Sequence, residues 1–265
     1  MTVIDAILLG LIQGVTEFLP ISSSGHLVLA NAFLGLDDNF TFSVLLNIGS
    51  LLVLIIFYRR KILDIIKRLF TKSEWRFVLK LIVATVPAVI IGVVFGDQIE
   101  YLNSLVWVVT IMLFVVGILF VFISKPSENA DDREVEQSVN WKSTLKIGIA
   151  QAIALIPGTS RSGITILTGI RSKLSVERAA EFSFLMAIPI IAGATFKTLL
   201  SDGGIQFVTN NLDKFLIGNL VCFVSGYIAI SSMMKLIANR GLKDFGWYRI
   251  SLAIFLGALL LAGVL

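Results

Sequence analysis

The sequence predicts an all-α polytopic membrane protein with an inverted-topology repeat, in which each half holds one re-entrant helix hairpin and three transmembrane helices. Three observations lead to this fold class. The 265-residue chain is 56% hydrophobic and only 15% charged, whereas about a quarter of the residues in a soluble domain are charged. Its apolar runs reach the roughly 20 residues that a bilayer-crossing helix needs. Two short polar stretches interrupt apolar runs, at residues 20–26 and 157–165, and polar residues at bilayer depth usually serve function.

These two stretches predict re-entrant hairpins. The first polar break is Pro-Ile-Ser-Ser-Ser-Gly-His at residues 20–26, and the second polar break is Pro-Gly-Thr-Ser-Arg-Ser-Gly-Ile-Thr at residues 157–165. Each follows an apolar helical run (3–19 and 143–156) and precedes one too short to span (26–36 and 164–170). Proline disfavours a helix interior, and irregular backbone at this depth must be buried in protein or line a cavity. We therefore expect hairpins at about 3–36 and 143–172.

Six further apolar runs predict transmembrane helices at about 40–58, 77–96, 105–123, 179–200, 215–236 and 248–265. Basic residues gather in 59–76 and in the loop after 236, which holds Arg240 and Lys243 with Arg249 just beyond. The positive-inside rule places both regions in the cytoplasm, and it explains the net charge of +4 better than nucleic-acid binding does. Residues 97–104 and 201–213 are then external loops, and both termini are external. The single cysteine, Cys222, excludes a disulfide framework.

An acidic segment divides the chain. Residues 125–142, which include Glu128, Glu134 and Glu136, predict a polar cytoplasmic linker. It joins repeat 1 (1–124) to repeat 2 (143–265) within a single integral membrane domain.

The two halves resemble each other in sequence. Aligning 10–26 with 148–164 gives five identities in seventeen positions, where about one is expected by chance for equally frequent residues. The identical pairs are Gly10 and Gly148, Gln13 and Gln151, Ser22 and Ser160, Ser24 and Ser162, and Gly25 and Gly163. Three crossings in each half invert the second half relative to the first. Inverted repeats of this kind form their sites at the repeat interface near mid-membrane, so we expect the two breaks to meet there.

The residues of the breaks suit an anion. Each break ends where a short helix begins, and a helix N-terminus offers unpaired N–H groups and a partial positive charge to phosphate. Arg161 adds a planar fork that matches phosphate oxygens. Hydroxyl groups and flexible glycine backbone complete the candidate binding set, which is Ser22, Ser23, Ser24, Gly25, Gly158, Thr159, Ser160, Ser162 and Gly163. The set forms an oxyanion cradle without a Walker motif.

Glu17, Gln13 and His26 add acid–base and metal-binding capacity. Gln13 and Glu17 are four residues apart and share a helix face. Glu17 can act as a base or bind a divalent cation, with Gln13 as a neutral oxygen ligand. His26, the only histidine, begins the short helix within expected reach of the serines and Glu17. Together with Arg161 the set contains candidates for the nucleophile, charge-neutralising and proton-handling roles of phosphoryl transfer.

Simpler readings exist for each residue. Serines before a helix are most often N-caps, a lone histidine is often structural, and Arg161 could hold a lipid phosphate without catalysis. Asn47 is equally readable as packing or as a neighbour of the site. Inverted repeats with broken helices also characterise secondary transporters. A transporter or flippase for an anionic lipid or solute is therefore the alternative function, and a lipid-binding structural protein is a third.

The motifs carry a family resemblance. The stretch from Gln13 to His26 resembles the first signature of the undecaprenyl pyrophosphate phosphatases of the bacitracin-resistance type, an acidic-or-Gln pair followed by a serine-rich turn and histidine. Pro-Gly-Thr-Ser-Arg-Ser-Gly-Ile-Thr, which ends at Thr165, is similar to the whole second signature. The segment from Glu181 to Pro189 resembles the stretch that follows it. The likeness covers essentially the whole chain.

The resemblance implies a multi-pass enzyme of the cytoplasmic (inner) membrane that hydrolyses undecaprenyl diphosphate to undecaprenyl phosphate and phosphate. This reaction recycles the lipid carrier of peptidoglycan synthesis and confers bacitracin resistance. The resemblance also implies an active site facing the extracytoplasmic side and a requirement for a divalent cation, Mg²⁺ or Ca²⁺. Carried over by position, Glu17, Ser23, His26 and Arg161 match the family's catalytic residues, and Gln13 matches the first member of the acidic pair. We expect the substrate to be bound by Gln13, Ser22, Ser24, Gly25, Thr159, Ser160, Ser162 and Thr165. Glu17 is the expected anionic metal ligand, with Gln13 as a candidate neutral ligand whose contact with the metal the sequence leaves open.

Several points stay open from sequence. Either Ser23 or His26 could be the nucleophile, with Ser23 favoured because a helix N-terminus supports a nascent alkoxide. We expect a polyprenyl diphosphate lipid and the bilayer as partners and no nucleic acid, while a homodimer is left open.

Overall fold

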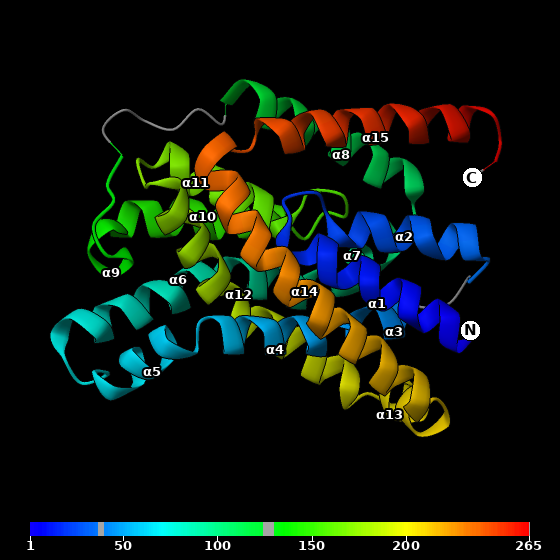
Figure 1. Ribbon diagram of the computed structural model, residues 1–265, viewed down its shortest axis with the longest axis horizontal. Helices are drawn as coiled ribbons and strands as arrows, with labels where there is room; N and C mark the ends of the chain where they lie inside the picture. Colours follow the sequence, from blue (N-terminus) through cyan, green and yellow to red (C-terminus); the bar gives the residue numbers. More distant parts are fainter. Residues whose placement is uncertain (37–39, 124–129, 265) are drawn as a thin grey trace.

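The computed structural model describes residues 1–36, 40–123 and 130–264, without the side chains of 238–240. Within these ranges the chain folds into fifteen α-helices and no β-strand (Figure 1). In order they are α1 Val3–Phe18, α2 Ser23–Leu34, α3 Phe40–Leu45, α4 Asn47–Phe57, α5 Arg59–Lys67, α6 Lys72–Val94, α7 Gly96–Asn103, α8 Val106–Ile123, α9 Val135–Ser138, α10 Trp141–Ile153, α11 Arg161–Arg171, α12 Val176–Leu199, α13 Asp202–Asn210, α14 Leu212–Arg240 and α15 Lys243–Leu261. The predicted all-α class is confirmed.

Within the part of the chain that the structure describes, six segments are long and apolar enough to cross a membrane: Phe40–Phe57, Lys72–Val94, Val106–Ile123, Val176–Leu199, Leu212–Ile237 and Lys243–Leu261. They correspond one for one to the six predicted transmembrane helices. The first is divided into α3 and α4, which meet at Leu46. The structure therefore fits a multi-pass membrane protein.

Three predicted loops are largely helical. Residues 97–104 lie mostly in α7 and 201–213 mostly in α13. α13 is capped by Ser201, whose hydroxyl oxygen accepts from the amide of Gly204. The predicted loop after 236 shrinks to two residues, because α14 continues to Arg240 and α15 starts at Lys243. The predictions differ from the structure because hydropathy locates only the apolar part of a helix, and a helix with polar ends continues beyond that part.

The two polar breaks share one local geometry. Both α2 and α11 start after a serine with positive φ, Ser22 (φ 76°, ψ 92°) and Ser160 (φ 73°, ψ 105°). Both serine hydroxyls cap their helix by accepting from the amide three residues on, in Gly25 (3.3 Å) and Gly163 (3.2 Å). A non-glycine residue with positive φ is uncommon, so its occurrence at aligned positions supports the internal repeat. The inverted topology and the re-entrant paths stay predictions.

Close helix pairs hold the breaks in place. α1 packs along α14, α10 along α6, and α8 along α15; α8 and α15 lie side by side in Figure 1. A Cβ atom at Gly14 of α1 would lie 2.1 Å from the Ser225 hydroxyl and 2.4 Å from the Cys222 carbonyl oxygen of α14. Small residues allow such close backbone approach between membrane helices. This contact fixes the C-terminal half of α1, which carries Glu17.

The linker is attached more firmly than its composition predicts. Residues 125–129, including Glu128, lie outside the described residues. Beyond them, Val135 and Val139 are buried, and the Glu136 carboxylate pairs with Lys61 at 2.6 Å. Burial alone would lower the pKa of Lys61, but its hydrogen bond to Glu136 and the charge of Glu181 outweigh burial and raise it. The described part of the predicted solvated linker is therefore fastened to α5, because its acidic side chains find basic partners there.

Candidate active site

The two breaks meet at the carboxylate of Glu17. Arg161, the first residue of α11, donates from Nη2 to Glu17 Oε1 at 2.6 Å across 144 positions of sequence. The side chains of Arg161 and Glu17 are only 15% and 11% exposed. The Ser162 hydroxyl lies 3.4 Å from the backbone oxygen of Glu17. The structure thus brings together the carboxylate and the guanidinium that the sequence assigns to one site.

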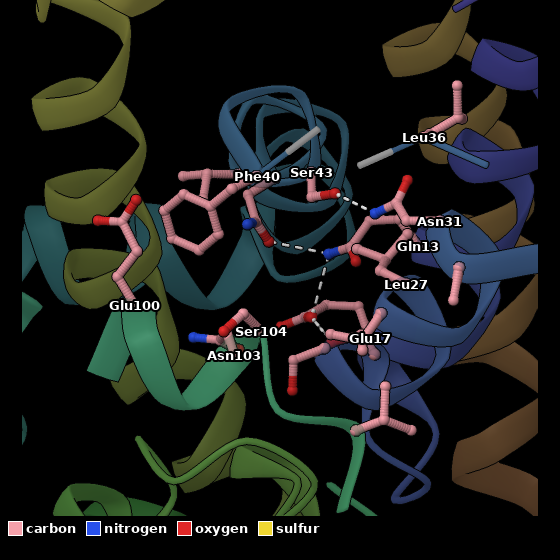
Figure 2. A pocket seen from close by; sticks show the side chains of 17 residues that line it. Gln13, Glu17, Leu27, Asn31, Leu36, Phe40, Ser43, Glu100, Asn103 and Ser104 are labelled. Atoms are coloured by element: carbon pink, nitrogen blue, oxygen red, sulfur yellow. Dashed lines mark hydrogen bonds between the residues drawn. The ribbon is translucent and has the colours of Figure 1, made fainter. Parts of the chain in front are cut away.

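The second carboxylate oxygen of Glu17 accepts hydrogen bonds from residues in the same half of the chain as Glu17. Ser23 donates its hydroxyl hydrogen to Glu17 Oε2 at 2.5 Å, and Gln13 Nε2 donates to the same oxygen at 3.1 Å. Gln13 Nε2 is also 2.9 Å from Asn47 Oδ1 (Figure 2). A short O–H···O⁻ bond is charge-assisted, and it leaves the Ser23 oxygen beside a base that can take its proton.

The serines divide into two roles. Ser22 and Ser160 are N-caps, as the simpler interpretation proposes. The Ser24 hydroxyl lies 3.3 Å from that of Ser22, and the Ser162 hydroxyl lies 3.4 Å from that of Ser160. Ser23 caps nothing in the described contacts and bonds the carboxylate instead. Among the serines of the first break it is therefore the one whose hydroxyl is bonded to the Glu17 carboxylate.

The other predicted binding residues shape the breaks. Thr165 is fully buried and lies 2.6 Å from the Ser183 hydroxyl, so it anchors α11 to α12. Thr159 is also fully buried. At Gly25 an added Cβ would lie 3.0 Å from a Val109 methyl group. These three residues support the turns, and none lines the two cavities described below.

His26 lies differently from the expectation. Its Nδ1 lies 2.7 Å from the backbone oxygen of Ser22 and its Nε2 lies 2.8 Å from the Tyr248 hydroxyl, whose ring is stacked on it. A carbonyl oxygen only accepts, so Nδ1 carries the hydrogen, and in the neutral imidazole Nε2 accepts from the tyrosine. Helical side chains lean toward the preceding turn, which explains why the imidazole reaches Ser22 rather than Glu17. Sequence reasoning missed Tyr248, because no local signal links it to His26.

A cavity of about 440 Å³ opens beside Glu17 and Ser23. Its wall combines polar residues, among them Gln13, Asn47 and Glu100, with an apolar set (Figure 2). The apolar set is Leu27, Val28, Leu36, Phe40, Val44 and Val106. A second hollow of about 90 Å³ is lined by both breaks, including Glu17, Ser23 and Arg161. The mixed walls suit a molecule with a charged head and an apolar chain.

The oxygen donors fit a divalent cation only in part. Among the described residues no three histidine, cysteine, aspartate or glutamate side chains come close enough to hold a metal ion. Glu17 is the one carboxylate among the residues that line the smaller hollow between the breaks, since Glu100 lines only the larger cavity. Gln13 presents its amide nitrogen to Glu17, so Gln13 orients Glu17 rather than extending an anionic ligand set. Mg²⁺ commonly uses one or two carboxylates and completes its shell with water and substrate phosphates. The site therefore fits a hard cation that arrives with a phosphorylated substrate.

Arg249 has a role that its place in the sequence does not indicate. The sequence associates it with the cytoplasmic loop, but its side chain is fully buried and its guanidinium donates to backbone oxygens of both breaks, including Pro20 at 3.3 Å and Gly158 at 2.6 Å. The positive-inside rule counts basic residues near helix ends, and it does not separate one that points into the protein.

Comparison with known proteins adds a family to this geometry. Residues 6–255 match the family model described as "Bacitracin resistance protein BacA". A protein of Nitrosomonas eutropha named "Undecaprenyl-diphosphatase" is 39% identical over 254 residues, covering 95% of this chain and 92% of its own. Proteins of the same name from Flavobacterium johnsoniae and Porphyromonas gingivalis are 36% and 35% identical. They cover 97% and 100% of this chain and 95% and 99% of their own.

Proposed function

The chain belongs to the bacitracin resistance protein BacA family, and on this premise we propose that it is a membrane-bound undecaprenyl-diphosphatase. It removes the terminal phosphate from undecaprenyl diphosphate and leaves undecaprenyl phosphate. The observation that carries this function is the single carboxylate of Glu17, which bonds Ser23 from one break and Arg161 from the other. A nucleophile, its base and an anion-binding cation thus converge at two helix N-termini.

The diphosphate head binds where the two breaks meet. The first turns of α2 and α11 direct unpaired amides toward an anion, and Arg161 contacts phosphate oxygens as a planar fork. The apolar wall of the larger cavity accommodates the first part of the prenyl chain. Because the substrate phosphates bring negative charge, Arg161 shifts part of its interaction from Glu17 to the substrate.

Ser23 acts as the nucleophile with Glu17 as its base. Glu17 takes the hydroxyl proton while Ser23 Oγ forms a bond to the terminal phosphorus. The anhydride P–O bond breaks, and undecaprenyl phosphate leaves. Water then attacks the phosphoserine, phosphate is released, and the proton on Glu17 returns to Ser23. A Mg²⁺ or Ca²⁺ ion held by Glu17 together with the phosphates would neutralise charge on the diphosphate.

His26 is the weaker candidate for the nucleophile. Its free nitrogen, Nε2, accepts from Tyr248, and the ring does not line either cavity. Attack by His26 would first require the tyrosine contact to open. The arrangement supports a role in holding the first turn of α2, where its other nitrogen bonds the carbonyl of the N-cap Ser22.

The site opens to the extracytoplasmic side. Glu100, Asn103 and Ser104, from the segment whose lack of basic residues predicts an external position, line the larger cavity. None of the basic residues of α5, predicted to be cytoplasmic, lines it. As part of the same proposal, we place the protein in the cytoplasmic membrane.

Phosphate release tests this function. Purified protein in detergent, supplied with farnesyl diphosphate and Mg²⁺, is expected to release one phosphate per substrate and leave farnesyl phosphate. The Ser23→Ala variant should be inactive, while Ser231→Ala is the matched control, because Ser231 bonds only a carbonyl of α14 in the described contacts. Wild-type protein that binds the substrate without releasing phosphate would contradict hydrolysis and favour transport of an anionic lipid.

A further inference from the structure

Arg249 connects the two breaks through their backbone. From α15, its Nη1 donates to Pro20 O at 3.3 Å in the first break. Its Nη2 donates to Gly158 O at 2.6 Å and Thr159 O at 3.1 Å in the second break, and lies 3.4 Å from Met112 O of α8. The side chain of Arg249 therefore contacts three parts of the chain that are distant in sequence, namely the first break, the second break and α8.

Backbone carbonyl groups and the aromatic ring of Phe120 surround the Arg249 guanidinium. Arg249 is fully buried, and no carboxylate among the described residues forms an ion pair with it. The Phe120 ring centroid lies 5.3 Å from its central carbon, as in a cation–π contact. A buried charge is costly unless it is hydrogen-bonded, so the carbonyl oxygens of the breaks are needed to keep Arg249 inside.

The two breaks in turn depend on Arg249 as a hydrogen-bond donor. The carbonyls of Pro20, Gly158 and Thr159 accept from no backbone amide in the described contacts and must find another donor in this buried region. Gly158 has φ of 88°, and a Cβ there would lie 2.6 Å from Val109 O of α8, so the turn is both unusual and tightly enclosed. Ser22 and Ser160 also have positive φ. Such backbone persists only where its surroundings over-determine it, and Arg249 supplies one shared donor to both turns.

The chemistry of the site depends on these turns. Ser23 and Arg161 directly follow the strained serines and begin α2 and α11. A shift of either turn would separate Ser23 or Arg161 from Glu17. We propose that Arg249 is a positioning residue, which fixes the distance between the two breaks and so aligns Ser23 and Arg161 on one diphosphate. This assignment rests on the proposed phosphatase function.

Two variants separate alignment from simple packing. Arg249→Met keeps an unbranched apolar stem and removes all the donors, whereas Arg249→Lys keeps the charge and can reach only part of the carbonyl set. Leu256→Ala is the packing control, because Leu256 is fully buried in an apolar cluster with Leu29, Val109 and Leu113, whose members all lie outside residues 20–26 and 157–165. Each purified variant is assayed for kcat, KM and Tm with farnesyl diphosphate.

For Arg249→Met we expect kcat to fall roughly 100-fold, because misplacement of reacting groups by about 1 Å has that effect, while KM changes less than about threefold. Arg249→Lys should recover roughly a tenth of wild-type kcat. Leu256→Ala should lower Tm with kcat near the wild-type value.

Three results would overturn the proposal. One is a kcat within about twofold of wild type in folded Arg249→Met, and another is a kcat loss that follows Tm as it does in Leu256→Ala. The third is failure of both Arg249 variants to fold, since the residue would then serve folding rather than alignment. An inactive wild-type protein would instead refute the phosphatase function.

Discussion

Replacement of Glu17 by glutamine isolates the charge at the centre of the site. Glutamine retains the size of the side chain, and its oxygen can still accept from Ser23. It cannot take the serine proton, however, and it leaves Arg161 without its anionic partner. A positioned base contributes about 10²–10⁴ in rate, so we expect Glu17→Gln to lower kcat by that factor, which is about 3–5 kcal/mol in the barrier.

Loss of a binding group normally raises KM, but we do not expect a higher KM in Glu17→Gln. In the wild type, Arg161 Nη2 is 2.6 Å from Glu17 Oε1, so substrate phosphates compete with the carboxylate for the guanidinium. At about 4 Å two unit charges interact by about 4 kcal/mol at an effective dielectric constant of 20, and the partial exposure of both side chains reduces this value. Removing the competing charge should leave KM for farnesyl diphosphate unchanged or lower.

A Mg²⁺ titration separates the two roles of Glu17. If the carboxylate only held the cation, saturating Mg²⁺ would restore kcat in Glu17→Gln. If Glu17 is the base, kcat of Glu17→Gln stays low at every Mg²⁺ concentration, although the Mg²⁺ concentration that gives half-maximal activity rises. Glu177→Gln is the matched control, since Glu177 is exposed in the first turn of α12. A kcat in Glu17→Gln within about threefold of wild type, with Tm retained, would refute the base assignment.

The remaining predictions concern the neighbouring groups. Ser23→Ala should lower kcat about a thousandfold or more and abolish a phosphoenzyme trapped with labelled substrate; retained turnover alongside an inactive His26→Ala would reverse the two roles. Arg161→Lys should reduce kcat/KM by roughly 10–100-fold, because a point charge loses bidentate contact; full activity would exclude the clamp. Tyr248→Phe removes only the hydroxyl that His26 Nε2 accepts from, and kcat should fall less than about fivefold; a larger loss would place His26 in the proton path. Gly14→Ala should lower both Tm and kcat, because its Cβ would lie 2.4 Å from a backbone oxygen of α14; unchanged thermal unfolding would contradict this helix contact.

The parts of the fold that sequence could predict are those governed by local composition. Runs of apolar residues give the six long helices, and Pro20 and Pro157 mark the breaks. The pairing of Glu17 with Arg161 was predictable because the internal repeat places their breaks at equivalent positions. The internal repeat thus supplied long-range information that a single motif lacks.

What sequence could not predict depends on rotation and long-range packing. Local helix geometry turns the imidazole of His26 toward Ser22, but no local signal reveals its second partner, Tyr248, which is 222 positions away. Arg249 is misread for the same reason, since a basic residue near a helix end looks the same whether it faces water or the interior. The partner of Glu136, Lys61, likewise becomes evident only when α5 and α9 are placed together.

The same alignment shows how one scaffold used twice becomes chemically asymmetric. Aligning Ser22 with Ser160 also aligns Ser23 with Arg161, and both donate to the one Glu17 carboxylate, to Oε2 and Oε1 respectively. Leu155 occupies the position aligned with Glu17, so the second repeat supplies no competing carboxylate. A second negative charge there would repel the diphosphate and divide Arg161 between two anions. Under the proposed mechanism, equivalent helix starts thus present a nucleophile on one side and a cation on the other, and Glu17 decides which end of the shared site performs proton transfer.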